Sequence, residues 1–105
     1  METSLKIVVV EPNKQPYVKT IENALEQLQG IVGGKLETVP LILDNKLAYI
    51  ICNEEGKIIP LPANRPYEWD IIHGTFFICG FDGREDVGSL TDKQIKQAIK
   101  MFALN

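Results

Sequence analysis

The residues that could carry chemistry lie close together, between positions 53 and 81. This stretch contains the only histidine of the chain, His73, the only tryptophan, Trp69, and a loop in which Arg65 follows Asn64. A planar guanidinium recognises carboxylates and phosphates, and arginine and large aromatic residues are enriched where proteins bind partners. We therefore predict that this loop belongs to the binding face of the protein.

Five side chains are predicted to contact a ligand or partner: Asn53, Asn64, Arg65, Tyr67 and His73. If Tyr67 and Trp69 anchor their loop to the core, Arg65 is held outward, with its guanidinium available to an acidic group. The same residues allow a second interpretation, in which Arg65 donates to neighbouring backbone carbonyls and serves only the fold.

His73 raises the question of catalysis, because imidazole titrates near neutral pH. Cys52 or Cys79 would be its nucleophile, with Asp70 orienting the ring. Both cysteines lie within apolar runs, where burial raises the pKa of a thiol and makes it a poor nucleophile. We therefore assign no catalytic residue. One histidine and two widely spaced cysteines also miss the pattern of a zinc site, so we expect no metal ion and no cofactor.

Length and composition predict one globular domain over residues 1–105. A hydrophobic share of 45% and a charged share of 24% are ordinary for a folded protein, which argues against disorder. The 11 basic residues are outnumbered by 14 acidic ones, and no basic stripe is present. Nucleic acid is therefore not an expected partner.

The sequence also predicts a cytoplasmic protein that does not enter a membrane. Its apolar runs are shorter than the ~18 residues of a membrane span, and we find no secretory leader. Cys52 and Cys79 are expected to be reduced and buried, since free cysteine is among the most often buried residue types.

A strand and a helix are predicted first along the chain. The run from Leu5 to Val10 predicts a central strand, because both of its faces are apolar. From Pro16 to Gln29, apolar residues recur at helical spacing, which predicts an amphipathic helix with Leu25 on its buried face. Gly30 is the expected left-handed residue at the end of this helix.

Three strands joined by two hairpin turns are predicted next. Pro40 cannot donate a ladder hydrogen bond, so its strand is expected at a sheet edge or a bulge. Asp44 and Asn45 tolerate positive φ, and Gly56 suits the left-handed position of the second turn. The predicted strands are 36–43, 46–52 and 57–61.

The remaining residues predict a long loop and two more strands. Segment 62–69 is the longest irregular one, and 70–73 is expected to form a brief turn. Residues 75–81 are apolar and predict a second central strand, followed by a short return strand at 87–90.

A capping box predicts where the final helix begins. Thr91 and Gln94 have the required spacing, in which each side chain bonds the other residue's backbone N–H. The resulting order is β-α-β-β-β-β-α, with hairpins in place of repeated crossovers. We therefore predict an α+β fold in which two helices pack on a mostly antiparallel sheet of about five or six strands.

Several segments together carry a family resemblance: Val9-Val10-Glu11-Pro12, Asn53-Glu54-Glu55-Gly56-Lys57 and Asp70-Ile71-Ile72-His73-Gly74-Thr75-Phe76-Phe77-Ile78. With others spread over almost the whole chain, they resemble an uncharacterised family of domains of unknown function from bacteria, phages and conjugative elements. The resemblance brings no activity or catalytic residue. It implies a setting, because accessory genes of mobile elements often encode small proteins that act against host defences.

We accordingly expect a non-catalytic binding module, a mobile-element accessory or counter-defence protein that contacts a host protein. The alternative is sequestration of a small anionic metabolite or nucleotide by Asn53, Asn64 and Arg65. A third hypothesis is a small enzyme that uses His73. An apolar surface patch would favour the protein partner, whereas a closed pocket lined by Arg65 would favour the small molecule.

Overall fold

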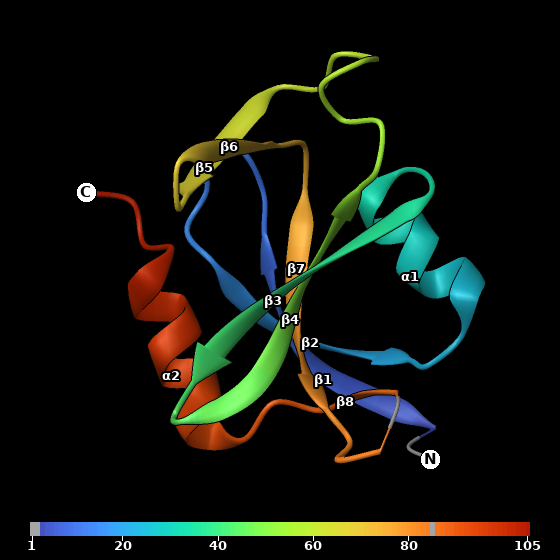
Figure 1. The fold of residues 1–105 in the computed structure, drawn as a ribbon, viewed down its shortest axis with the longest axis vertical. Helices are drawn as coiled ribbons and strands as arrows, with labels where there is room; N and C mark the ends of the chain where they lie inside the picture. Colours follow the sequence, from blue (N-terminus) through green and yellow to red (C-terminus); the bar gives the residue numbers. More distant parts are fainter. Residues whose placement is uncertain (1–2, 85) are drawn as a thin grey trace.

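One antiparallel sheet with two apolar faces organises the fold (Figure 1). The computed structural model describes residues 3–84 and 86–105. The strands of the sheet are β1 (Ser4–Val10), β2 (Tyr17–Glu22), β3 (Leu36–Leu43), β4 (Lys46–Asn53), β7 (Phe76–Phe81) and β8 (Val87–Gly88). They lie in the order β2-β1-β7-β4-β3, with β8 paired to β7, and this arrangement confirms the predicted α+β class.

A helix covers each face of the sheet. Side chains alternate along a strand, so Val8 and Val10 of β1 join the core beneath α2 (Asp92–Met101), whereas Val9 joins the core beneath α1 (Leu25–Val32). β1 is therefore buried on both faces, as its apolar run predicts. Within the described residues, neither helix is long and apolar enough to cross a membrane.

The predicted helix over 16–29 is wrong in its first half, where the chain forms β2. This strand pairs with β1 in antiparallel register along its whole length. The β-branched side chains of Val18, Thr20 and Ile21 lose rotamer freedom in a helix and fit well in a strand. With a partner strand only a short turn away, these preferences outweigh the helical spacing of the apolar residues.

The helix that does form, α1, is shorter than predicted and turns a different face to the core. It begins at Leu25, whose side chain is 61% exposed, and it buries Leu28 and Val32. Gly33, with a φ of 80°, is the left-handed residue at its end. Gly30, predicted for that position, lies within the helix.

The predicted strand over 57–61 is also wrong. These residues form consecutive turns, in which the N–H groups of Ile58 and Ile59 both donate to the Glu55 carbonyl at 3.0 Å. Pro60 and Pro62 each lack the N–H that a strand would donate, so an apolar sequence is not enough for pairing here.

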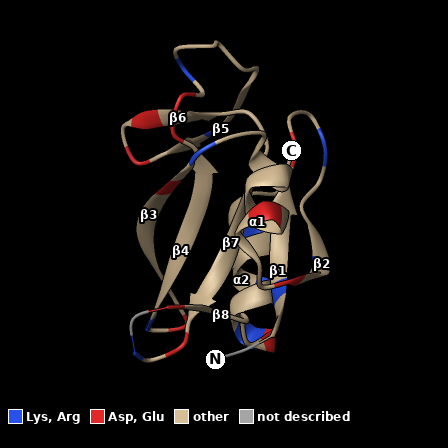
Figure 2. Ribbon diagram, turned by 90° about the vertical axis from the view of Figure 1, so that its right-hand side faces the viewer, with Lys and Arg blue, Asp and Glu red and all other residues tan. Residues whose placement is uncertain are grey.

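The predicted loop 62–69 and turn 70–73 form a separate hairpin. Its strands are β5 (Ala63–Tyr67) and β6 (Asp70–His73), which pair with each other and with no strand of the main sheet among the described residues. The observed order is therefore β-β-α-β-β-β-β-β-β-α. The hairpin lies at one end of the main sheet, beyond the ends of β3 and β4 (Figure 2), and Tyr67 and Ile72 pack it against the core beneath α2.

Three local predictions are confirmed. β3 lies at the edge of the sheet, where Pro40 costs no ladder hydrogen bond. Asp44 and Asn45 form the turn between β3 and β4 with φ values of 52° and 58°. The capping box is complete, because the Thr91 hydroxyl accepts the Gln94 N–H at 3.1 Å and the Gln94 side chain accepts the Thr91 N–H at 3.0 Å.

The corrected helix gives a matched pair of substitutions. Leu28→Ala removes a buried side chain and should lower the free energy of unfolding by ~2–5 kcal/mol. Leu25→Ala lies on the exposed face of the same helix and should change that free energy by less than ~0.5 kcal/mol. Urea denaturation measures both. A larger loss of stability from Leu25→Ala than from Leu28→Ala would mean that α1 turns its other face to the sheet.

Candidate binding groove

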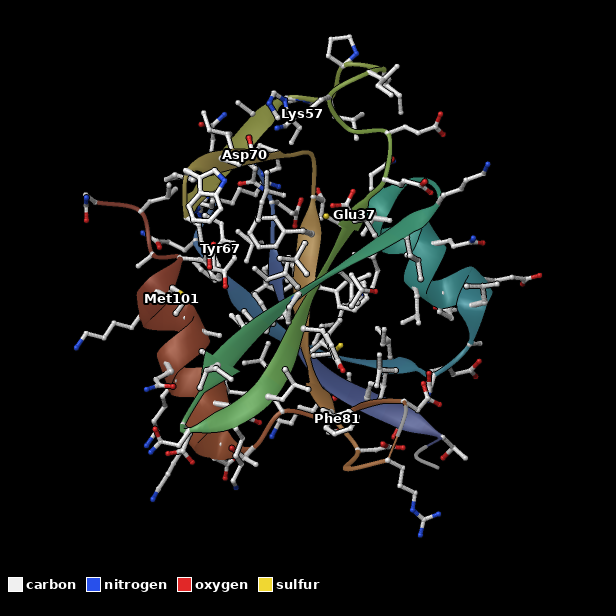
Figure 3. All side chains as sticks on the ribbon, viewed as in Figure 1. Glu37, Lys57, Tyr67, Asp70, Phe81 and Met101 are labelled. Carbon is white, nitrogen blue, oxygen red and sulfur yellow. The ribbon has the colours of Figure 1, made fainter. Side chains whose placement is uncertain are left out.

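A groove of about 490 Å³ separates the β5–β6 hairpin from the end of β3 and from the loop after β4 (Figure 3). We call it the Trp69 groove. Its apolar lining comes from Val39 of β3, Cys52 of β4, and Tyr67 and Ile72 of the hairpin. All four side chains are buried or half-buried, so they form its floor and inner wall.

Large apolar side chains lie exposed around the mouth of this groove. Trp69, in the two-residue turn of the hairpin, is 93% exposed. Ile58 is 79% exposed and Ile71 is 47% exposed, and all three residues line the groove. Trp69 therefore does not anchor the hairpin to the core, as the sequence had led us to expect.

The rim of the groove is acidic. Carboxylates gather around the hairpin turn and the facing end of β3 (Figure 2), where Glu37, Glu54, Glu68 and Asp70 line the groove. Lys57 forms an ion pair with Asp70, and this hydrogen bond, with that from the Ile71 N–H, lowers the pKa of the Asp70 carboxyl. The other three carboxylates form no ion pair with any described residue.

The structure brings three of the five predicted binding residues to the groove: Asn53, Tyr67 and His73. Tyr67 does anchor the hairpin, because its hydroxyl donates to the Pro40 carbonyl at 3.3 Å and its ring lies 6.4 Å from that of Phe102. Its binding role, like that of the other four residues, stays a prediction.

His73 is half-buried, and one of its ring nitrogens is already engaged. Nδ1 lies 2.9 Å from the Leu61 carbonyl oxygen, which can only accept a hydrogen bond. In the neutral ring Nδ1 therefore carries the hydrogen, and Nε2 is the acceptor. This contact ties β6 to the loop that closes the groove.

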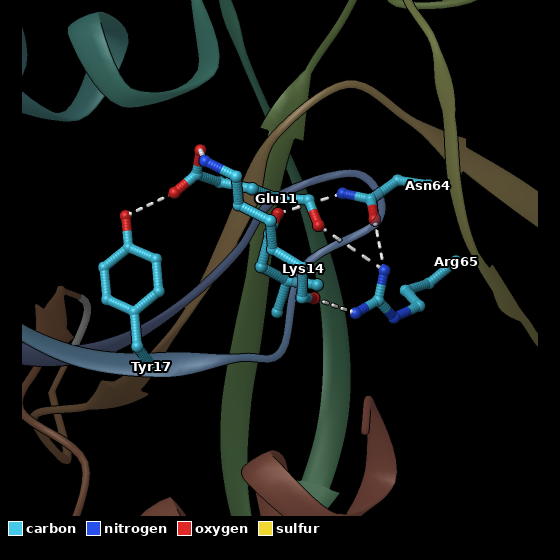
Figure 4. Close-up of polar contacts among 6 residues, drawn as sticks. Glu11, Lys14, Tyr17, Asn64 and Arg65 are labelled. Carbon is cyan, nitrogen blue, oxygen red and sulfur yellow. Dashed lines mark hydrogen bonds and ion pairs between the residues drawn. The ribbon is translucent and has the colours of Figure 1, made fainter. Parts of the chain in front are cut away.

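Arg65 is only 5% exposed, and the expectation that its guanidinium points outward is wrong (Figure 4). Nε donates to the Phe102 carbonyl at 2.8 Å, and Nη2 donates to the Lys14 carbonyl at 2.5 Å. Nη1 donates to Asn64 Oδ1 at 2.7 Å and to the Glu11 carbonyl at 3.5 Å. Burial lowers the pKa of Arg65, and the carbonyl at the end of α2 favours its charge. These contacts agree with the alternative stated in the sequence analysis, in which Arg65 donates to backbone carbonyls and serves the fold.

Asn64 extends the same network and does not line the groove. Its side-chain amide donates to the Val10 carbonyl at 2.9 Å and to the Gly74 carbonyl at 2.8 Å, while its oxygen accepts from Arg65. It thus links the end of β1 to the connection between β6 and β7. Both side-chain groups are used within the protein.

Asn53 is buried at the end of β4, and its side chain caps the C-terminal end of α1. Its amide donates to the Val32 carbonyl at 3.1 Å, and its oxygen accepts the Glu55 N–H at 2.7 Å. A Cβ at Gly34 would lie 2.9 Å from the Asn53 amide nitrogen, so any other residue there would shift the Asn53 side chain. Asn53 therefore holds the loop after β4 in place, and its amide nitrogen and its oxygen each have a hydrogen-bond partner within the protein.

The exposed residues of the groove mouth were missed in the sequence. One signal was available: Trp69 lies between Glu68 and Asp70, where an aromatic residue flanked by carboxylates suits a solvent-exposed turn better than a core anchor. A second signal was the pair of isoleucines before Pro60, which could not pair as a strand. Glu37 gave no signal, because only the folding of the hairpin places it near Glu68.

The groove offers little nucleophilic chemistry. Burial, with a smaller contribution from Glu37, raises the pKa of the Cys52 thiol to about 11, so the thiol stays protonated at neutral pH. Cys79 belongs to the core beneath α1, and burial raises its pKa to about 12. No cluster of three or more metal-ligating side chains occurs within residues 3–84 and 86–105.

The fold and the groove define a small α+β domain with an open, partly apolar surface cleft. Residues 5–103 match the family described as Domain of unknown function (DUF3846), and the chain belongs to that family. This match confirms the resemblance to an uncharacterised family of domains. No curated protein and no solved structure matches the chain.

Burial of the thiols predicts their reactivity. Both cysteines are free and buried, so native protein should react slowly with a thiol reagent at pH 8, and both thiols should react after unfolding in urea. Because folding raises both pKa values above 9, the contribution of the two thiols to stability should be constant well below pH ~9 and should fall as the pH rises further, where only the unfolded thiols ionise. Rapid labelling of the native protein would contradict this placement of the cysteines.

Proposed function

We propose that this protein is a non-catalytic binding module that holds a partner protein in the Trp69 groove. The observation that carries the proposal is the exposure of Trp69, which is 93% accessible at the groove mouth. Tryptophan is strongly enriched at binding hot spots, and a contiguous exposed apolar patch on a small domain marks an interaction site. Ile58 and Ile71 extend the apolar surface around it.

The alternative, sequestration of a small anionic metabolite or nucleotide, has less support. The polar groups that would bind an anion, on Asn53, Asn64 and Arg65, form hydrogen bonds within the protein. The groove itself is lined by four carboxylates against one lysine, and carboxylates repel an anion. An enzyme that uses His73 is also less supported, since the Cys52 thiol is protonated at neutral pH.

The setting of this function is part of the proposal. We propose an accessory or counter-defence protein of a mobile element that contacts a host protein in the cytoplasm. The mobile element is what the resemblance seen in the sequence implies, and two unpaired cysteines suit a reducing compartment.

Trp69→Ala should abolish capture of the partner. Wild-type protein and the variant, each immobilised, are incubated with a bacterial lysate, and the retained proteins are compared by mass spectrometry. Ile42→Ala is the matched control, because Ile42 is 63% exposed but does not line the groove. We expect a protein that wild type and Ile42→Ala retain and Trp69→Ala loses, with melting temperatures equal within the error of the measurement.

Two results would contradict the proposal. One is that Trp69→Ala retains the same proteins as wild type. The other is that native mass spectrometry of the purified protein finds a bound small anion whose binding does not depend on Trp69.

A further inference from the structure

We infer that the Trp69 groove recognises an arginine or lysine that lies beside an aliphatic residue in a segment of the partner. This inference rests on the proposed function and names the chemistry of the partner. Three features of the groove support it: its charge, its exposed indole and its apolar floor.

The charge of the groove favours a cation. Glu37, Glu54 and Glu68 reach it from β3, the loop after β4 and the hairpin turn, and none forms an ion pair with a described residue. Lys57 is the only lysine or arginine among the lining residues, and Asp70 already engages it. An incoming ammonium or guanidinium therefore meets unpaired carboxylates from separate elements, whereas an incoming carboxylate would be repelled.

Trp69 adds a second attraction for the same group. A cation over the face of an indole is attracted by the negative charge of the ring face, and tryptophan is the strongest of the aromatic side chains in this respect. Glu68 and Trp69 both line the groove, so one cation in it can lie near both a carboxylate and the ring. The indole is 93% exposed and can contact a ligand without displacing any part of the protein.

The apolar floor explains why the cation should have an aliphatic neighbour. Val39 and Ile72 line the groove beneath the charged rim, and Ile71 extends this surface toward solvent. The methylene stem of an arginine or lysine covers apolar surface while its head stays at the polar rim. A neighbouring aliphatic side chain in the partner would bury the remaining apolar area.

A second copy of the chain is the competing occupant. Lys93, Lys96 and Lys100 lie exposed on α2 and could present cations to the groove of another molecule. Such a contact would be head-to-tail and would generate open chains of molecules. The test below separates this occupant from a partner segment.

The test uses random dodecapeptides displayed on phage and selected on the wild-type protein. We expect the enriched sequences to carry arginine or lysine beside an aliphatic residue. A synthetic copy of the most enriched peptide should lose ~10-fold or more in affinity when its arginine is replaced by citrulline or its lysine by norleucine, since hydrogen bonds to charged groups are the strong ones. Affinity should also fall as salt is raised.

Matched variants of the protein locate the binding. Glu37→Gln combined with Glu68→Gln should weaken the peptide by a similar factor, while Glu26→Gln on α1, exposed and outside the groove, should leave it unchanged. Enriched peptides that are neutral or acidic, yet lost with Trp69→Ala, would overturn this inference and leave the proposed function standing. Failure to enrich any peptide, or peptides insensitive to Trp69→Ala, would overturn both. Concentration-dependent self-association that Trp69→Ala and Lys96→Glu each abolish would overturn the inference in favour of a second copy.

Discussion

The buried guanidinium of Arg65 joins parts of the chain that strand pairing leaves separate. Among the residues that the structure describes, β5 and β6 pair only with each other, and an isolated two-stranded hairpin is at best marginally stable in water. Arg65 donates to carbonyls of the turn after β1 and to the Phe102 carbonyl at the end of α2. Burial removes the hydrogen bonds that these carbonyls would form with water. The Arg65 guanidinium replaces them, and this favours the attachment of the hairpin.

The groove follows from this attachment. Asn64 and Arg65 hold the first part of β5 against the core, and Tyr67, next to the turn, bonds the Pro40 carbonyl of β3. Asn53 fixes the opposite wall by closing α1 and the loop after β4. The residues that hold the groove in shape thus point their polar side chains into the protein. Trp69, at the hairpin turn, remains exposed for contact. The sequence assigned partner contact to Arg65 and anchoring to Trp69. In the structure Arg65 anchors the hairpin, and Trp69 is the residue exposed for contact.

Local patterns in the sequence predict the central part of the fold. The apolar runs of β1 and β7, the proline in β3 and the capping box of α2 each depend on neighbours a few residues away. β2 could not be told from a helix, because the spacing of its apolar residues suits both and the partner strand decided between them. The candidate site was predictable only in part. Arg65 was singled out correctly as unusual, but whether it points inward depends on Phe102, 37 residues away.

The most direct test of this account is hydrogen–deuterium exchange of Arg65→Lys. Lysine keeps the positive charge but lacks the planar fork that reaches several carbonyls at once. We predict that the amides of β5, β6 and Gly74 exchange roughly tenfold faster or more, since a charge-assisted hydrogen bond contributes ~1.5–3 kcal/mol, while β4 and β7 keep their protection. Unchanged exchange in the hairpin, or an equal loss of protection in all strands, would contradict the claim that Arg65 holds the wall of the groove.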